Sequence, residues 1–299
     1  NYVNLLPNKQ INIEKKEESL KVECENYKTK IRGISAEDFP LIPKVDKKNG
    51  YRANVKEFKK ALSQVVFAVS QSDSRLELSG VLFSFRNDKL TLAGTDSYRL
   101  TEKDLEVKND SNKKEEETII VPAKTIQELI RIISNLGEES DIQKDSEEIN
   151  FYISDNQILF SIQSTEMVSR LIEGQYPDYK QIIPQDKKTT AMLDRGELIR
   201  AVKTSSLFSK TGINDVNLDF PKGKNKIVVS STSGQTGENV VNIDGDVNGE
   251  DNGIIVNYQY LLDGLNNIEE DVIKVEVVDN NTPFVLKPKN NKSYLYVIM

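Results

Sequence analysis

The feature that most constrains this sequence is a turn that occurs twice. Phe39-Pro40 returns as Tyr176-Pro177, 137 positions later, and each copy precedes a charged amphipathic segment. Phe58 in the first segment and Leu198 in the second lie 140 positions apart. A period of this length is that of a whole domain and not of a solenoid unit. The sequence therefore predicts a string of similar domains, of which the first is represented only by its final part.

The residue types that the chain lacks exclude most catalytic and metal-binding classes. There is no histidine, and Cys24 is the only cysteine among 299 residues. Nucleophile systems that use histidine are excluded, and one thiol cannot build a zinc site. No Gly-rich phosphate-binding loop of either common type is present. We therefore expect no metal and no cofactor, and any catalysis would rest on carboxylates, lysines or hydroxyls.

Composition and the single cysteine indicate the cellular environment in which the chain functions. Apolar residues make up 37% and charged residues 29%, and no apolar run approaches the roughly 20 residues that span a bilayer. One cysteine permits no intrachain disulfide, which suits a reducing cytoplasm. We expect a cytoplasmic protein that does not insert into a membrane.

Periodicity in the first half predicts helices that alternate with antiparallel strands. Asn54 caps a helix whose apolar positions are three and four residues apart, and Asn87-Asp88 joins two strands as a hairpin. A second helix is predicted from Pro122 to Gly137. Strands are expected at 11–33 (several short ones), 76–86, 89–95, 149–154, 157–163 and 167–173, with a polar linker at 44–52.

The second half repeats this order and fixes the predicted fold class. Helices are expected near 195–207 and 257–267, and strands near 216–231, 238–244, 272–287 and 293–299. Two helices for each set of strands predict an α+β fold of repeated domains, each with two helices packed on antiparallel sheets. We predict three segments: a C-terminal remnant of a first domain at 1–45 and two complete domains at 46–184 and 185–299.

The most distinctive run is Thr95-Asp96-Ser97-Tyr98-Arg99-Leu100, which follows a Gly80-Val81-Leu82-Phe83 strand. In this run the chain resembles the bacterial DNA polymerase III beta subunit, the sliding clamp. The segments 176–179, 257–263 and 296–299 match the same family in order and spacing. Taken alone, Asp96 could simply accept turn amides while Arg99 pairs with a carboxylate. The resemblance implies instead one wall of an apolar pocket between the second and third domains.

Such a pocket would hold a short peptide motif from a polymerase or clamp loader, with aliphatic groups for burial and polar groups for orientation. Gln181 stands where the family commonly has a basic residue. The resemblance implies that the pocket uses Leu78, Thr95, Ser97, Tyr98, Arg99, Leu100, Pro177, Gln181, Ile182, Ile213, Asn257, Tyr260, Val297, Ile298 and Met299.

Charge is distributed unevenly between the predicted helices and the rest of the chain. The segments 52–70, 122–136, 195–210 and 257–268 together carry +6, whereas the whole chain carries −7. Lysines opposite an apolar stripe are often only a solvated face. Four such helices on one side of repeated domains favour a shared basic lining that binds duplex DNA without sequence preference. The predicted DNA-contacting residues are Arg52, Lys56, Lys59, Lys60, Arg75, Lys124, Arg195, Arg200 and Lys203.

The resemblance also implies the assembly and its partners. It implies a homodimeric ring in which Leu207 and Phe208 of one subunit meet the strand around Thr29 and Ile31 of another. It implies a non-catalytic, nucleoid-associated processivity factor that encircles duplex DNA. Its expected partners are the DNA polymerase III alpha subunit, the clamp loader and other proteins with a clamp-binding motif.

Two alternatives come from the residues themselves. A carboxylate-dependent hydrolase would use Asp96, Asp178 or Asp279, and a peptide-binding scaffold would not contact DNA at all. The run Asp244–Gly249 matches half of a calcium loop, but its twelfth position is Ile255 and not the required glutamate. We interpret this run as an acidic hairpin loop without calcium.

Overall fold

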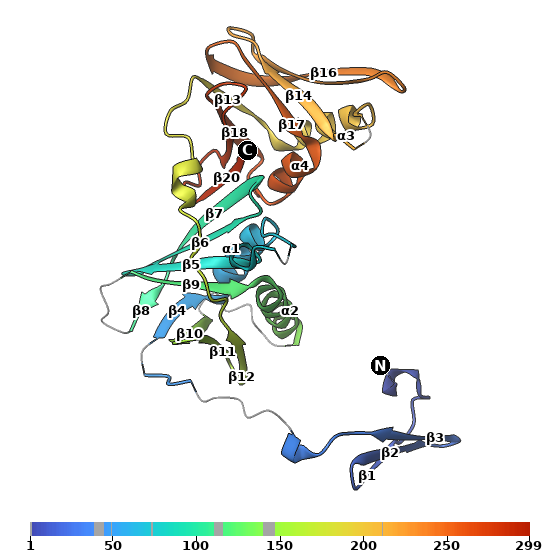
Figure 1. The fold of residues 1–299 in the computed structure, drawn as a ribbon. Helices are drawn as coiled ribbons and strands as arrows, with labels where there is room; N and C mark the ends of the chain where they lie inside the picture. Colours follow the sequence, from blue (N-terminus) through green and yellow to red (C-terminus); the bar gives the residue numbers. More distant parts are fainter. Residues whose placement is uncertain are drawn as a thin grey trace. The chain divides into compact units, whose positions relative to one another are not determined.

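A computed structural model describes residues 2–38, 45–48, 50–72, 74–110, 116–139, 147–210 and 212–299, without the side chains of 137–139. The chain divides into two compact units, Asn1–Lys44 (unit 1) and Val45–Met299 (unit 2) (Figure 1). The first copy of the repeated turn, around Phe39, lies outside the described residues. None of the described helices is long and apolar enough to cross a membrane.

Unit 1 is a three-stranded antiparallel sheet with one apolar and one polar face. Its elements are η1 (Val3–Leu5), β1 (Asn12–Lys16), β2 (Ser19–Cys24), β3 (Tyr27–Arg32) and η2 (Ala36–Asp38), with the strand order β1-β2-β3. Alternate side chains of a strand point to opposite faces. Val22 and Cys24 are buried on the apolar face, where the Cys24 thiol lies 3.8 Å from the Pro7 carbonyl. The short strands predicted over 11–33 are confirmed.

Unit 2 contains four helices, α1 (Val55–Val66), α2 (Ala123–Glu139), α3 (Arg195–Ser206) and α4 (Tyr258–Asn266), and two sheets. The five-stranded sheet has the order β12-β11-β10-β4-β8. The twelve-stranded sheet has the order β17-β14-β15-β16-β13-β18-β19-β20-β7-β6-β5-β9. The strands in the first half of unit 2 are β4 (Gly50–Asn54), β5 (Gly80–Arg86), β6 (Lys89–Thr95), β7 (Arg99–Glu106), β8 (Lys108–Asn109), β9 (Glu117–Pro122), β10 (Glu148–Ser154), β11 (Gln157–Ile162) and β12 (Thr165–Arg170).

The second half of unit 2 repeats the first. Its strands are β13 (Thr189–Asp194), β14 (Asp215–Phe220), β15 (Lys226–Ser233), β16 (Gly237–Gly249), β17 (Asn252–Asn257), β18 (Val272–Val277), β19 (Phe284–Pro288) and β20 (Tyr294–Ile298). The first residues of α1 and α3 lie 140 positions apart, and those of β3 and β12 lie 138 apart. The α+β fold predicted from the repeat is confirmed.

The helices begin where local sequence signals place them. The side chains of Asn54, Asp194 and Asn257 accept backbone N–H groups at the starts of α1, α3 and α4. Helix α2 differs from the prediction, because Pro122 is the last residue of β9 and the helix continues through Gly137 to Glu139. A glycine inside a helix costs only about 1 kcal/mol, which the rest of the helix can offset.

All four helices lie along one side of unit 2 in the view of Figure 1, with α3 and α4 beneath strands β14, β16 and β17. In α1 the predicted apolar positions Phe58, Leu62 and Val65 are fully buried in a core shared with the sheets. The second repeat buries an equivalent core beneath α3 and α4. A third, smaller cluster, which includes Leu100, Tyr179 and Val297, also contributes to the core of unit 2.

The predicted acidic hairpin at Asp244–Gly249 is wrong, because these residues form the second half of the 13-residue strand β16. Residues 237–244 pair with β15 and residues 245–249 pair with β13. The strand thus links two parts of the sheet. Gly249 has a φ of +116°, and a Cβ there would lie 1.9 Å from the Lys188 carbonyl oxygen. Glycine is needed for this close strand contact and not for a turn.

Other differences concern strand limits. The predicted strand at 76–86 begins only at Gly80, because residues 76–78 form a 3₁₀ turn, η3. The predicted linker 44–52 ends in strand β4, whose pairing with β10 is long-range. Such pairing leaves no local sequence signal.

One carboxylate on the second repeat holds three lysines. Lys274 and Lys287 lie 2.7 Å and Lys187 lies 3.0 Å from the Glu276 carboxylate, which is 10% exposed. Burial alone would raise the pKa of Glu276, but hydrogen bonds from the lysines outweigh it and lower that pKa to about 2. This contribution to stability is complete above the ordinary pKa of 4.5 and is lost as the pH falls toward 2.

We therefore expect Glu276→Gln to lower the free energy of unfolding at pH 7 by roughly 1 to 3 kcal/mol, because three ammonium groups would face one another without a countercharge. Urea unfolding measured between pH 7 and pH 3 checks this. The difference between wild type and variant should shrink at low pH. Glu173→Gln, an exposed glutamate, is the control and should leave stability unchanged; an equal loss in both variants would contradict the assignment.

Candidate functional site

The two repeats of unit 2 meet through one strand pair. Strand β7 of the first repeat pairs antiparallel with β20 of the second, with Leu100 opposite Val297 and Thr101 opposite Tyr296. Leu100, Thr101, Tyr296 and Val297 are fully buried. Backbone pairing and apolar burial therefore make the junction part of one continuous sheet.

Arg99 links both sides of this junction. Its guanidinium donates to Asp96 at 3.1 Å, to the Phe67 carbonyl at 3.1 Å and to the carboxylate of Asp263 in α4. It also lies 4.8 Å from the centre of the Tyr260 ring. The side chain is only 12% exposed. Arg99 is thus held by both repeats, and its donors are already used inside the chain.

The turn before Arg99 is fixed by its own side chains. Asp96 accepts the backbone N–H groups of Tyr98 and Arg99, both at 3.0 Å. Thr95 accepts the N–H of Ser97, which has a φ of +76°. Local hydrogen bonding compensates for this uncommon backbone conformation. The turn holds Tyr98 outward, where it is 63% exposed and stacks on Tyr260 at a ring distance of 6.1 Å.

A segment over the sheet brings the remaining predicted pocket residues to the same area. Tyr179 of η4 (Tyr179–Ile182) is buried, and its hydroxyl donates to Glu102 on β7. Burial and this hydrogen bond raise the pKa of Tyr179 above its usual range. Pro177 and Ile182 flank this anchor, and Gln181 donates to Asp178 at 2.8 Å.

The structure sorts the predicted peptide-contacting residues by exposure. Leu78, Thr95, Leu100, Val297 and Ile298 are buried and support the area from within. Half-buried positions are Arg99, Pro177, Ile182, Asn257 and Tyr260, and Asn257 also caps α4. Exposed positions are Ser97, Tyr98, Gln181, Ile213 and Met299. An incoming peptide can therefore reach only the second and third groups.

The cations of the helices differ in how much of their charge is free. Within the described residues, Lys59, Lys124 and Lys203 have no ion-pair partner, and Lys56 is exposed. Lys60 pairs with Glu269, and Arg200 lies 3.9 Å from Glu197.

Three predicted cations do not lie on the exposed faces of the helices. Arg52 belongs to β4 and not to α1, and it pairs with Asp110 and Glu148 at 2.8 and 3.2 Å. Arg75 precedes η3 and bonds Glu77. Arg195 donates to the carbonyls of Leu265 and Glu270, so it joins α3 to the end of α4.

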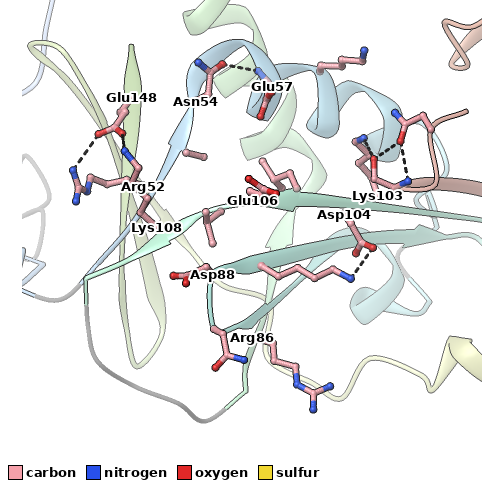
Figure 2. A pocket seen from close by; sticks show the side chains of 18 residues that line it. Arg52, Asn54, Glu57, Arg86, Asp88, Lys103, Asp104, Glu106, Lys108 and Glu148 are labelled. Atoms are coloured by element: carbon pink, nitrogen blue, oxygen red, sulfur yellow. Dashed lines mark hydrogen bonds and ion pairs between the residues drawn. The ribbon is translucent and has the colours of Figure 1, made fainter. Parts of the chain in front are cut away.

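A groove of about 1500 Å³ lies between the start of α1, β4, the β5–β6 turn and the end of β7, and Figure 2 shows the side chains that line it. Glu148 binds both Arg52 and Lys108 there, and Lys89 pairs with Asp104 at 2.8 Å. Lys103 is buried and donates to Ser293 at 2.5 Å across the junction. Burial and the positive charge of Lys60 lower the pKa of Lys103. The ion pairs named here thus lie within the first repeat, whereas Lys103 forms a hydrogen bond across the junction.

The carboxylates of the hydrolase alternative have separate structural roles. Asp96 orders its turn, Asp178 accepts from Gln181, and Asp279 accepts the N–H of Asn281 at 2.9 Å. The described residues contain no group of three or more acidic, cysteine or histidine side chains placed to hold a metal. Nothing in this arrangement supports hydrolysis.

The residues predicted to join subunits lie on both units. In unit 2, Leu207 follows α3 and is 73% exposed, whereas Phe208 is half-buried. In unit 1, Ile31 is exposed, and Thr29 donates to the Tyr2 hydroxyl at 2.5 Å.

Sequence reasoning missed the partners that fix the junction. Asp263 and Phe67 hold Arg99, and Gln64 donates to the Asn267 carbonyl at 2.9 Å. Arg99 and Asp263 are 164 positions apart, and no local pattern pairs them.

We expect Arg99→Lys to loosen this junction, because an ammonium cannot reproduce the fork of donors or the ring contacts of a guanidinium. Amides of α4 and β20 should lose hydrogen-exchange protection, and stability should fall by about 1 to 3 kcal/mol. Arg75→Lys is the control, since Arg75 is exposed and has one carboxylate partner. Unchanged protection of α4 in the Arg99 variant would contradict this role.

Comparison with known proteins gives a consistent set of relatives. Residues 52–178 match the model of the DNA polymerase III beta subunit, central domain, and residues 180–299 match that of its C-terminal domain. The chain is 32% identical over 270 residues to the beta sliding clamp of Staphylococcus aureus, covering 90% of this chain and 68% of that protein.

Solved structures agree. The DNA polymerase sliding clamp from Bacillus subtilis superposes with a TM-score of 0.89 at 27% identity, over 100% of this chain and 76% of that one. The DNA polymerase III beta subunit from Thermotoga maritima shares the fold, with a TM-score of 0.87 at 23% identity over 100% and 77% of the two chains.

Proposed function

The chain belongs to the family of the bacterial DNA polymerase III beta subunit, the beta sliding clamp, and from this premise we propose how its own residues serve that function. The observation that carries the proposal is the repeat itself. It gives each repeat of unit 2 two helices, and all four helices lie along the same side of unit 2 in the view of Figure 1. Such repeats can line a ring with helices, and enclosure then retains DNA without tight binding. The protein acts without catalysis, as a cytoplasmic processivity factor.

The proposed DNA contacts are cations of the helices, of which Lys56, Lys124, Arg200 and Lys203 are exposed and Lys59 is half-buried. Lys59, Lys124 and Lys203 carry charge that no described carboxylate neutralises. Lysine contacts to phosphates are independent of sequence, and salt weakens them. Arg52 and Arg195 contribute through structure, since their guanidinium groups bind partners inside the chain.

The triple variant Lys59→Gln, Lys124→Gln and Lys203→Gln tests these contacts. We expect its Kd for a 30-base-pair duplex to rise on the order of 10-fold, and the slope of log K against log salt to fall in magnitude by about 2 to 3. Fluorescence anisotropy over a salt series measures both. The matched control removes the same charge from loops, with Lys222→Gln, Lys224→Gln and Lys289→Gln. Equal losses in the two variants would reject the helix lining, and a wild-type chain without measurable affinity for the duplex would favour a peptide-binding scaffold.

We propose that the area around Tyr98 and Tyr260 docks short apolar segments of partner proteins. The support is its exposed aromatic and apolar groups above buried strand residues, with the N–H of Met299 donating to the Tyr98 carbonyl at 2.9 Å. Partners of this family, the DNA polymerase III alpha subunit, the clamp loader and other proteins with a clamp-binding motif, are the proposed occupants. Because the donors of Arg99 are used internally, apolar burial supplies most of the affinity here.

Tyr98→Ala should weaken binding of a fluorescent peptide with consecutive large apolar residues about 10-fold, since the change removes an exposed aromatic contact without opening the core. Fluorescence polarisation measures the Kd. Ile255→Ala, which alters an exposed apolar residue on β17, should have no effect. A peptide that binds both variants equally well would place its site elsewhere.

We propose that two copies form a homodimer through an antiparallel strand pair equivalent to the β7–β20 pair that joins the two repeats within one chain. Strand β3 pairs only with β2, and residues 237–244 of β16 pair only with β15. Both therefore present free edges. Strand β16 begins 138 positions after β7, and β12 begins 138 positions after β3. Strand β12 is the last strand of its repeat, and β20 is the last strand of the following repeat.

The register of this pairing follows from the repeat. Thr101 lies opposite Tyr296 in the junction within the chain. Thr101 corresponds to Asn239, and Tyr296 corresponds to Thr29, so Asn239 of one copy should lie opposite Thr29 of another. Leu207 and Phe208 at the end of α3 would pack beside this pair.

The division into 1–45, 46–184 and 185–299 stays a proposal. The boundary between units 1 and 2 after Lys44 supports its first limit, and the two family models change between residues 178 and 180.

A further inference from the structure

The polar face of unit 1 carries an excess of positive charge that no ion pair removes. It is formed by alternate residues of β1, β2 and β3, and it holds five cations and two carboxylates: Lys16, Lys21, Lys28, Lys30 and Arg32 with Glu14 and Glu23. Glu23 pairs with both Lys21 and Lys28, and Glu14 pairs with Lys16. Lys30 and Arg32 have no ion-pair partner in the part of the chain that the structure describes.

The cations converge on a small cavity. Lys21 lies directly opposite Lys30 in the β2–β3 register, an arrangement that destabilises a sheet unless an anion is present. A cavity of about 240 Å³ opens there, lined by Lys16, Ser19, Lys21, Lys28, Thr29 and Lys30. Four of its six lining residues are therefore lysines.

The fold does not require this charge. The repeated sheet of unit 2 has the same register 138 positions later, with Leu159 opposite Val168 where unit 1 has Lys21 opposite Lys30. The equivalent face, formed by alternate residues of β10, β11 and β12, carries one cation, Arg170, and two carboxylates, Glu148 and Glu166. The unit 1 face therefore has a net charge of +3 and the unit 2 face a net charge of −1.

We propose that this face of unit 1 binds the phosphodiester backbone of DNA, at a site separate from the helix lining. Strands lie about 4.8 Å apart and same-face residues about 6.8 Å apart along a strand, so several ammonium groups can meet neighbouring phosphates. The face has no apolar anchor of the kind that holds an acidic peptide. The choice of DNA as the polyanion rests on the proposed function.

The test changes Lys16→Gln and Lys21→Gln, which lie on β1 and β2, away from the β3 edge proposed to join copies. The matched control, Lys9→Gln and Lys15→Gln, removes equal charge from the same unit outside this face. Anisotropy with the 30-base-pair duplex over a salt series is measured on the full chain. We expect the Kd of the test variant to rise 5- to 10-fold at low salt and its salt slope to fall in magnitude by about 2, with the control within 2-fold of wild type.

The outcomes separate this inference from the proposed function. Loss of affinity in the helix triple variant alone keeps the helix lining and overturns the unit 1 site. Loss in the Lys16 and Lys21 variant alone keeps the unit 1 site and rejects the lining. Polyglutamate is the competing probe: if the variant loses binding to polyglutamate but keeps its affinity for DNA, the face takes an acidic protein and the inference is wrong.

Discussion

The antiparallel pairing of β7 with β20 is the interaction on which the rest of unit 2 depends. It turns two repeats into one twelve-stranded sheet, and its central residues are fully buried. Backbone hydrogen bonds fix the register, while Arg99 and Lys103 bond across the same boundary. Because successive side chains point to opposite faces and both faces are buried here, a one-residue slip would exchange the two sets of packed side chains, so the relative position of the repeats is strongly specified. This pairing therefore determines where the helices lie and where the area around Tyr98 and Tyr260 lies.

A division of charge follows from the same arrangement. The sheets carry many ion pairs, including the groove in which Arg52, Lys108 and Glu148 neutralise one another. Within the described part of the chain, the helix residues Lys59, Lys124 and Lys203 have no ion-pair partner. A protein that must let DNA slide needs weak, separated phosphate contacts and not a tight site. Closure of a ring would provide the retention that these contacts lack.

Local sequence signals predicted much of this fold. The cap at Asn54, the buried stripe of α1 and the Asn87-Asp88 hairpin depend on neighbouring residues, so the sequence predicted them directly. The α+β class followed from their repetition. The run at Asp244–Gly249 misled because its glycines serve strand contact and not a turn.

The site was predicted only through its resemblance to a family. The resemblance singled out Arg99 and Tyr98, but it did not show that Arg99 is held by Asp263 and Phe67. Nor did it show that Arg52 precedes α1 and is neutralised. These facts depend on residues far apart in sequence, whose pairing only the folded chain determines.

The central claim is that the strand pairing within one chain also joins two chains. The most direct measurement is oxidative cross-linking of a chain with Thr29→Cys and Asn239→Cys, since opposed residues of antiparallel strands lie within disulfide reach. The account predicts covalent dimers on a non-reducing gel. A shifted chain with Thr29→Cys and Asn242→Cys should give far fewer. No dimers, or equal yields from both registers, would contradict the claim.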